Sequence, residues 1–93
     1  MDNKELPELI NSFLTGKAQD HDLLREKIRL SVLDLLMNNI SWLYQVLYRI
    51  DVREEKVRDA FKDNPLAEVA AERIADLIVE RQLEKLKWRQ KYS

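Results

Sequence analysis

The sequence contains no cysteine, only one glycine and only two prolines among its 93 residues. Without cysteine, the chain has no disulfides, no thiolate metal ligands and no cysteine nucleophile, and we expect it to work in the reducing cytoplasm. With so few glycines and prolines, the chain has few of the residues that form the turns between the strands of a sheet. A single glycine also excludes both glycine-rich phosphate-binding fingerprints, because each of them needs several glycines.

Long hydrophobic runs are also missing. The uncharged stretch at residues 35–48 is shorter than the roughly 20 apolar residues that span a bilayer. The first ten residues, MDNKELPELI, are acidic and contain no basic leader. We therefore expect neither a secretion signal nor membrane insertion.

Charged residues make up 35% of the chain, and leucine, glutamate, lysine, arginine and alanine, all good helix formers, are plentiful. The spacing of apolar residues by three and four predicts helices at about 7–14, 22–50, 52–62 and 65–89. A chain of this length forms one domain. The sequence thus predicts an all-α fold in which residues 1–93 form a small bundle of two long and two short helices.

Local signals place the ends of these helices. Pro7 suits a first helical turn, and Gly16 suits the end of the first helix. The residues from Asp51 to Glu54, DVRE, match a capping box, in which the Asp51 carboxylate accepts from the amide of Glu54. Pro65 suits the first turn of the last helix.

The predicted helix 22–50 is apolar over more than half of its circumference. At about 100° per residue, its apolar positions form two neighbouring stripes. One stripe contains Leu33, Leu36, Ile40, Leu43, Leu47 and Ile50, and the other contains Leu24, Ile28, Val32, Leu35, Trp42 and Val46. Because two short helices and one long one cannot cover so wide a surface, we expect a second copy of the chain to cover the rest.

The last predicted helix also has more than one apolar face. One face contains Leu66, Ala67, Ala70, Ala71, Ile74, Leu77 and Ile78. Another face, turned by more than 90° from the first, contains Val79, Leu83 and Leu86. Either the helix bends near Arg81, or its end packs against a partner. We expect a homodimer that buries more than about 1,200 Å². Its predicted interface contains Trp42, Val46, Val79, Leu83 and Leu86.

Charge is distributed unevenly along the chain. The net charge of −1 divides into +4 for residues 81–93 and −5 for residues 1–80. An acidic row with four-residue spacing precedes the basic end, so each basic end could lie across the acidic row of a partner copy. This row contains Glu68, Glu72, Asp76, Glu80 and Glu84.

The basic end supports an alternative role in nucleic-acid binding. Bases release counterions from phosphates, and aromatic rings stack on exposed nucleobases. Cations at a helix C-terminus also complement the helix dipole, and the rest of the chain is acidic, which favours the interaction role. The candidate nucleic-acid contacts are Lys85, Lys87, Trp88, Arg89 and Lys91.

Catalytic and metal-binding signals are weak. His21 lies between Asp20 and Asp22, but three consecutive side chains at a helix start diverge, and an aspartate there is explained by helix capping. No Glu-x-x-His pair of the di-metal bundles is present, and no serine stands in a nucleophile elbow. We expect no enzyme activity, no metal and no cofactor.

Two segments, LYRIDVREEKV and AAERIADLIVERQLEKL, resemble small all-helical bacterial proteins of the domain-of-unknown-function kind. The resemblance covers roughly residues 40–86 and rests on structural positions. It implies a helical fold and brings no activity with it. The function we expect is that of a non-enzymatic module for protein–protein interaction or self-assembly.

Overall fold

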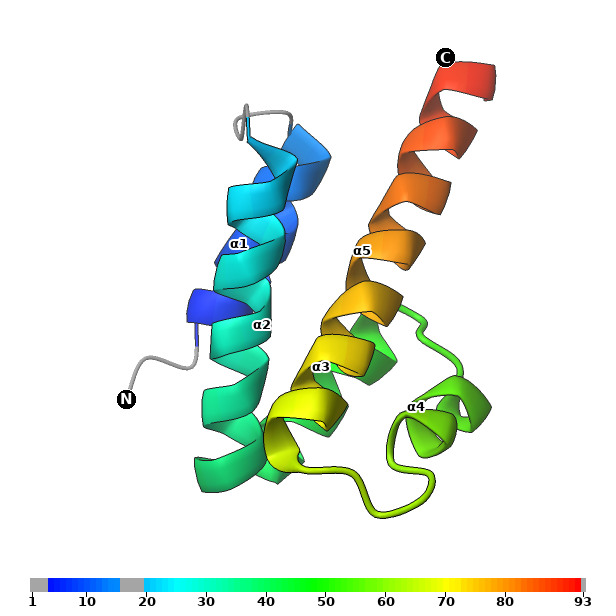
Figure 1. The fold of residues 1–93 in the computed structure, drawn as a ribbon. Coiled ribbons are helices and arrows are strands. Elements are labelled where there is room, and N and C mark those ends of the chain that lie inside the picture. The colour runs from blue at the N-terminus through cyan, green and yellow to red at the C-terminus, as the bar shows by residue number, and fades with distance from the viewer. Residues whose placement is uncertain (1–3, 16–19, 93) are drawn as a thin grey trace.

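The computed structural model describes residues 4–15 and 20–92, and the side chains of these residues as far as Trp88. In this part of the chain it contains five helices and no strand, which confirms the all-α prediction (Figure 1). The helices are α1 (Glu5–Thr15), α2 (His21–Asn38), α3 (Ile40–Arg49), α4 (Glu54–Ala60) and α5 (Ala67–Tyr92). Gly16, the predicted end of the first helix, lies outside the described residues.

The predicted helix 22–50 is wrong in one respect, because it is broken at Asn39. The backbone of Asn39 is not helical, with φ −159° and ψ 66°. Its backbone amide donates to the carbonyl oxygen of Leu35 at 2.8 Å, and its side-chain oxygen accepts from the backbone amide of Trp42 at 3.3 Å. One asparagine therefore ends α2 and caps the start of α3.

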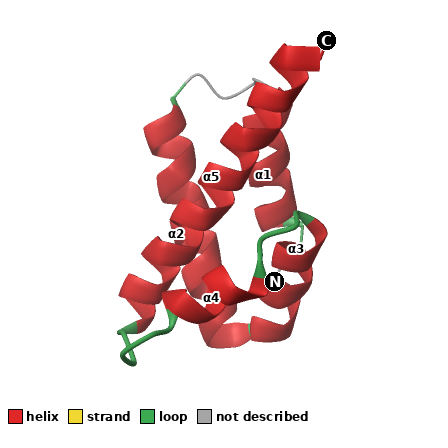
Figure 2. Ribbon diagram, turned by 90° about the vertical axis from the view of Figure 1, so that its right-hand side faces the viewer, coloured by secondary structure: helices red, strands yellow, loops and turns green. Residues whose placement is uncertain are grey.

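The break changes how the apolar surface is covered. Beyond Asn39, α3 leaves the end of α2 in a new direction and turns toward α5 (Figures 1 and 2). Val32 of α2 and Leu43 of α3 both reach the core and are fully buried. The apolar residues of α2 and α3 are therefore carried by two separate helices, and both helices contribute to the core. The prediction of a second copy assumed one continuous helix that was too apolar for its neighbours to cover, so that argument no longer holds.

The core is a single cluster to which every helix contributes. α2 and α5 run side by side in opposite directions, with α1 packed against both (Figures 1 and 2). Alanines on α5 let that helix approach its neighbours closely. The buried residues are Leu6, Ile10 and Phe13 of α1, Leu24, Ile28, Val32 and Leu35 of α2, Leu43, Val46 and Leu47 of α3, Val57 and Ala60 of α4, and Ala71, Ile74, Ala75 and Ile78 of α5.

The connections around α4 differ from the sequence prediction. No capping box forms, because α4 begins at Glu54 and the residue before it, Arg53, makes no side-chain capping bond. Asp51 instead has φ 61°, a left-handed conformation that ends α3 and turns its carboxylate toward α5. The last helix begins at Ala67 rather than Pro65, after a turn in which Asn64 also has a positive φ.

Candidate interaction surfaces

The structure does not bring the five predicted interface residues onto one exposed surface. Val46 is buried in the core between α3 and its neighbours. Trp42, Val79 and Leu86 are partly buried and pack against that core. Among the five, Leu83 alone is exposed, with 42% of its surface accessible. The second apolar face predicted for the last helix is therefore largely used within the chain, and α5 continues without interruption past Arg81.

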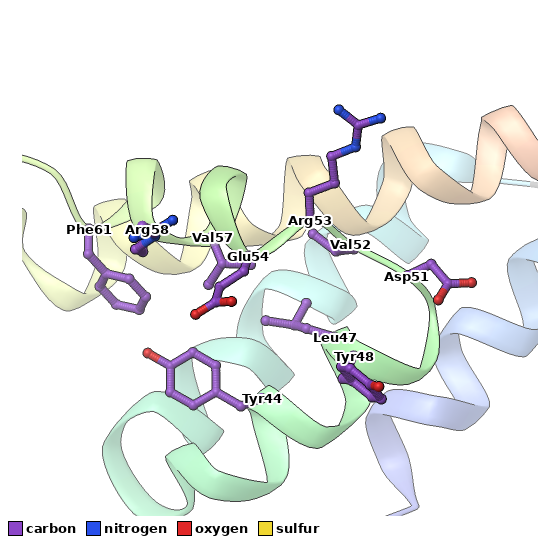
Figure 3. A pocket seen from close by; sticks show the side chains of 10 residues that line it. All are labelled: Tyr44, Leu47, Tyr48, Asp51, Val52, Arg53, Glu54, Val57, Arg58 and Phe61. Atoms are coloured by element: carbon purple, nitrogen blue, oxygen red, sulfur yellow. The ribbon is translucent and has the colours of Figure 1, made fainter.

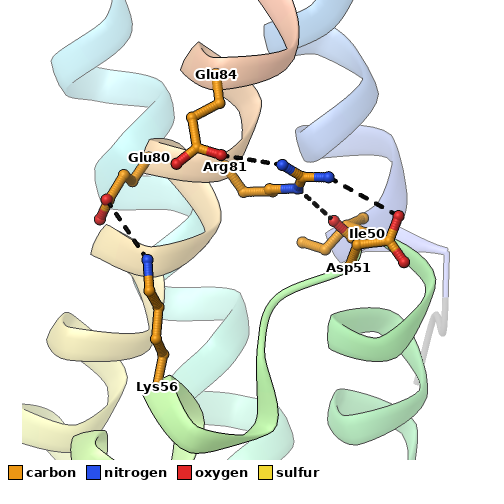
Figure 4. Close-up of polar contacts among 6 residues, drawn as sticks. All are labelled: Ile50, Asp51, Lys56, Glu80, Arg81 and Glu84. Atoms are coloured by element: carbon orange, nitrogen blue, oxygen red, sulfur yellow. Dashed lines mark hydrogen bonds and ion pairs between the residues drawn. The ribbon is translucent and has the colours of Figure 1, made fainter.

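The second half of the acidic row on α5 is engaged by bases of the same chain. Asp76 accepts from the Nε atom and from one terminal nitrogen of Arg25 on α2, and these hydrogen bonds raise the pKa of Arg25. Glu80 lies 3.8 Å from the Nζ atom of Lys56 on α4 (Figure 4). Both pairs are largely exposed to solvent, so each contributes little to stability. They nevertheless leave less free negative charge for the basic end of a second copy.

Arg81 connects α5 to the end of α3 (Figure 4). Its Nε atom donates to the carbonyl oxygen of Ile50 at 3.2 Å, and one terminal nitrogen donates to Glu84 at 2.9 Å. The other terminal nitrogen lies 3.9 Å from the carboxylate of Asp51. The guanidinium thus satisfies a carbonyl at a helix end, where backbone groups otherwise lack partners.

A groove of about 630 Å³ lies between α3 and α4. Leu47 and Val57 form its floor, and the rings of Tyr44 and Phe61 face one another across it, with the carboxylate of Glu54 turned into the space between them (Figure 3). Rings beside a carboxylate suit an apolar or cationic group. The remaining lining residues are Tyr48, Asp51, Val52, Arg53 and Arg58.

The basic end of the chain is partly described. Lys85 is half-buried, whereas Lys87 and Trp88 are exposed on α5. The side chains of Arg89 and Lys91 lie outside the described residues. The structure therefore places two of the five candidate nucleic-acid contacts at the surface.

The residues around His21 have structural partners. The carboxylate of Asp20 accepts from the amide of Leu23 at 3.0 Å, which makes Asp20 the N-cap of α2. The imidazole of His21 stacks on the ring of Phe13, with centroids 4.6 Å apart. Within the described residues, no group of three or more histidines or carboxylates is arranged to hold a metal ion.

One exposed apolar surface lies on α2 and was not predicted from the sequence. Leu23, Leu30 and Met37 have 53%, 52% and 70% of their surface accessible. They are spaced by seven residues, so at about 100° per residue they lie on one face, opposite the buried Leu24, Ile28, Val32 and Leu35. We call these three residues the α2 ridge. In the sequence, the seven-residue spacing of these three apolar residues is the signal that could have identified this surface.

No helix in the described part of the chain is long and apolar enough to cross a membrane. Comparisons of the chain with protein-family models, curated proteins and solved structures gave no match.

Proposed function

We propose that this chain is a non-enzymatic helical interaction module that associates with itself as a homodimer. The α2 ridge is the observation that carries the proposal. Leucine and methionine are unfavourable in water, since fully burying one such side chain contributes about 1.5–3 kcal/mol. Three of them in register on one helix face form the kind of surface that marks an interaction site.

A second copy is the simplest partner for this surface. A two-fold dimer places the same patch of both copies against itself, so that one ridge covers the other and the assembly closes at two copies. The proposal differs from the sequence-based dimer in the surface it uses, because the ridge lies on α2 and the predicted interface residues lie on α3 and α5. The lack of cysteine is compatible with a module that works in the cytoplasm.

Light scattering after size-exclusion chromatography tests the proposal. We expect the wild-type mass to be twice 11.1 kDa, and we expect Leu30→Glu to return a single chain of 11.1 kDa. Leu83→Glu is the matched control, because Leu83 is similarly exposed but lies on α5. This control should remain dimeric, and circular dichroism should show both variants to be folded.

Two outcomes contradict the proposal. A wild-type mass of 11.1 kDa at high protein concentration and moderate salt would refute self-association. A monomeric Leu83→Glu beside a dimeric Leu30→Glu would place the interface on α5, as the sequence predicted, and not on the α2 ridge.

Nucleic-acid association is a second candidate, favoured by the exposed neighbours Lys87 and Trp88. A phosphate contact by Lys87 predicts that affinity for a labelled single-stranded RNA falls steeply with salt. Fluorescence anisotropy of wild type and of Lys87→Glu measures this effect. No binding at low salt would eliminate the candidate.

A further inference from the structure

We infer that the two copies pair through antiparallel α2 helices that cross on a two-fold axis at Leu30, with Lys27 of each copy beside Asp34 of the other. This inference rests on the self-association proposed above and names its geometry. It depends on the spacing of the α2 ridge, on the charges beside the ridge, and on the partners of the neighbouring side chains.

The spacing fixes the centre of the pairing. Leu23 and Met37 each lie seven residues from Leu30, one before it and one after it. If two antiparallel copies cross at Leu30, Leu23 of one copy meets Met37 of the other at both ends. A strict seven-residue repeat is also the pattern that keeps two helices in contact along a seam.

The charges beside the ridge select the antiparallel direction. Lys27 and Asp34 are both exposed and lie on the same side of the ridge, within about 20° of each other around the helix. Crossing at Leu30 brings Lys27 of one copy near Asp34 of the other, twice by symmetry. A parallel two-fold pair would instead place these side chains of the two copies on opposite flanks of the ridge, so Lys27 of one copy could not meet Asp34 of the other.

The neighbouring charged groups do not compete for this pairing. Lys27 forms no ion pair with any described residue, and Asp34 accepts a hydrogen bond only from the side chain of Asn38, at 2.9 Å. On the other side of the ridge, the guanidinium of Arg29 is bound to Glu26, with its Nε donating at 3.0 Å. That hydrogen bond lowers the pKa of Glu26, so the carboxylate is charged and already engaged at neutral pH.

Cysteine cross-linking tests the axis directly, because the chain has no cysteine of its own. Helices packed about 8–10 Å apart bring Cα atoms within reach of a disulfide only at positions that face one another across the contact. We expect Leu30→Cys to form a covalent dimer under mild oxidation. Leu23→Cys and Met37→Cys should not link alone, but a mixture of the two should form a heterodimer.

The outcomes separate this geometry from the proposed function. A wild-type dimer in which Leu30→Cys fails to link would overturn the α2 geometry and leave self-association standing. Efficient linking of Leu23→Cys to itself would show a parallel pair and would also overturn the inference. A wild-type monomer by light scattering would overturn both, and the α2 ridge would then be free for a different partner.

A charge exchange tests the two ion pairs. Lys27→Asp and Asp34→Lys should each weaken the homodimer by about tenfold, because each change replaces both attractive pairs with repulsive ones. Mixed together, the two variants restore opposite charges at both positions, so they should form a heterodimer of near wild-type affinity by sedimentation equilibrium. If mixing restores nothing, the pairing of Lys27 with Asp34 is wrong.

Discussion

At the scale of single residues, Gln82 is an unusual member of the core. It is fully buried on α5, and neither its amide nitrogen nor its amide oxygen has a hydrogen-bond partner. Leaving a buried polar group unsatisfied costs about 1–3 kcal/mol. We therefore expect Gln82→Met, which keeps the shape of the side chain and removes the amide, to raise the free energy of unfolding in urea by about 1–3 kcal/mol.

Gln45→Met is the matched control for this prediction, because Gln45 is exposed on α3 and its amide is free to bind water. It should leave the free energy of unfolding nearly unchanged. If Gln82→Met does not stabilise the protein, the amide is satisfied in solution by a buried water. Periodicity could not predict this site, since a glutamine among apolar residues reads as a surface position.

At the scale of helices, Asn39 separates two elements that the apolar pattern joined. Its side chain caps α3, and loss of such a cap costs about 1 kcal/mol. We expect Asn39→Ala to lower the free energy of unfolding by about this amount and Asn39→Ser, which keeps a capping oxygen, to lower it less. Urea denaturation measures both.

The exposed Asn11, inside α1, supplies the control for the cap. Asn11→Ala should be neutral or slightly stabilising, because alanine is the better helix former. An Asn39→Ala variant as stable as wild type would mean that the cap contributes nothing and that packing alone breaks the helix.

The outer helices were more predictable than the connections between them. Apolar spacing located the first and last helices to within a few residues, because a helix that packs on one side repeats its apolar positions. The same spacing continued across Asn39, so only the capping preference of the pair Asn38–Asn39 signalled the break. The capping box at Asp51 does not form because α4 begins only at Glu54, and the Asp51 carboxylate lies instead 3.9 Å from Arg81 on α5, a contact that sequence spacing does not reveal.

The α2 ridge was not predicted from the sequence. Leucine is common on both faces of α2, and the face that packs inward is decided by where α1 and α5 lie against it. The five predicted interface residues failed to form one surface for the same reason, since α3 turns Val46 into the core. Tertiary packing, which local patterns do not contain, selects the exposed face.

The end of α5 offers a prediction that separates the two dimer models. Leu86 packs against the core, whereas Lys87 and Trp88 are exposed. Deletion of residues 87–93 should therefore keep the fold and, if the α2 ridge is the interface, should also keep the dimer in light scattering. Deletion of residues 86–93 is the comparison, because it removes a core contact and should lower the melting temperature further. A monomer after the shorter deletion would assign dimerisation to the basic end of the chain.

At the scale of the whole molecule, stability and association are linked. Each chain has its own buried core, so a single copy should fold without its partner. The dimer adds stability that depends on concentration, because anything that binds the folded state and not the unfolded one raises the melting temperature. We expect the wild-type melting temperature to rise over a roughly hundredfold increase in protein concentration.

The substitution Leu30→Glu isolates this contribution from the stability of the single chain. Leu30 is half exposed and faces away from the core, so the glutamate should disturb little within one copy. The variant should melt at a temperature that does not depend on concentration and that matches the wild type at high dilution. Differential scanning calorimetry at matched concentrations measures both curves. A variant that melts far below the diluted wild type would show that Leu30 supports the fold of each chain, and the α2 ridge would then be part of the folding core rather than a contact between copies.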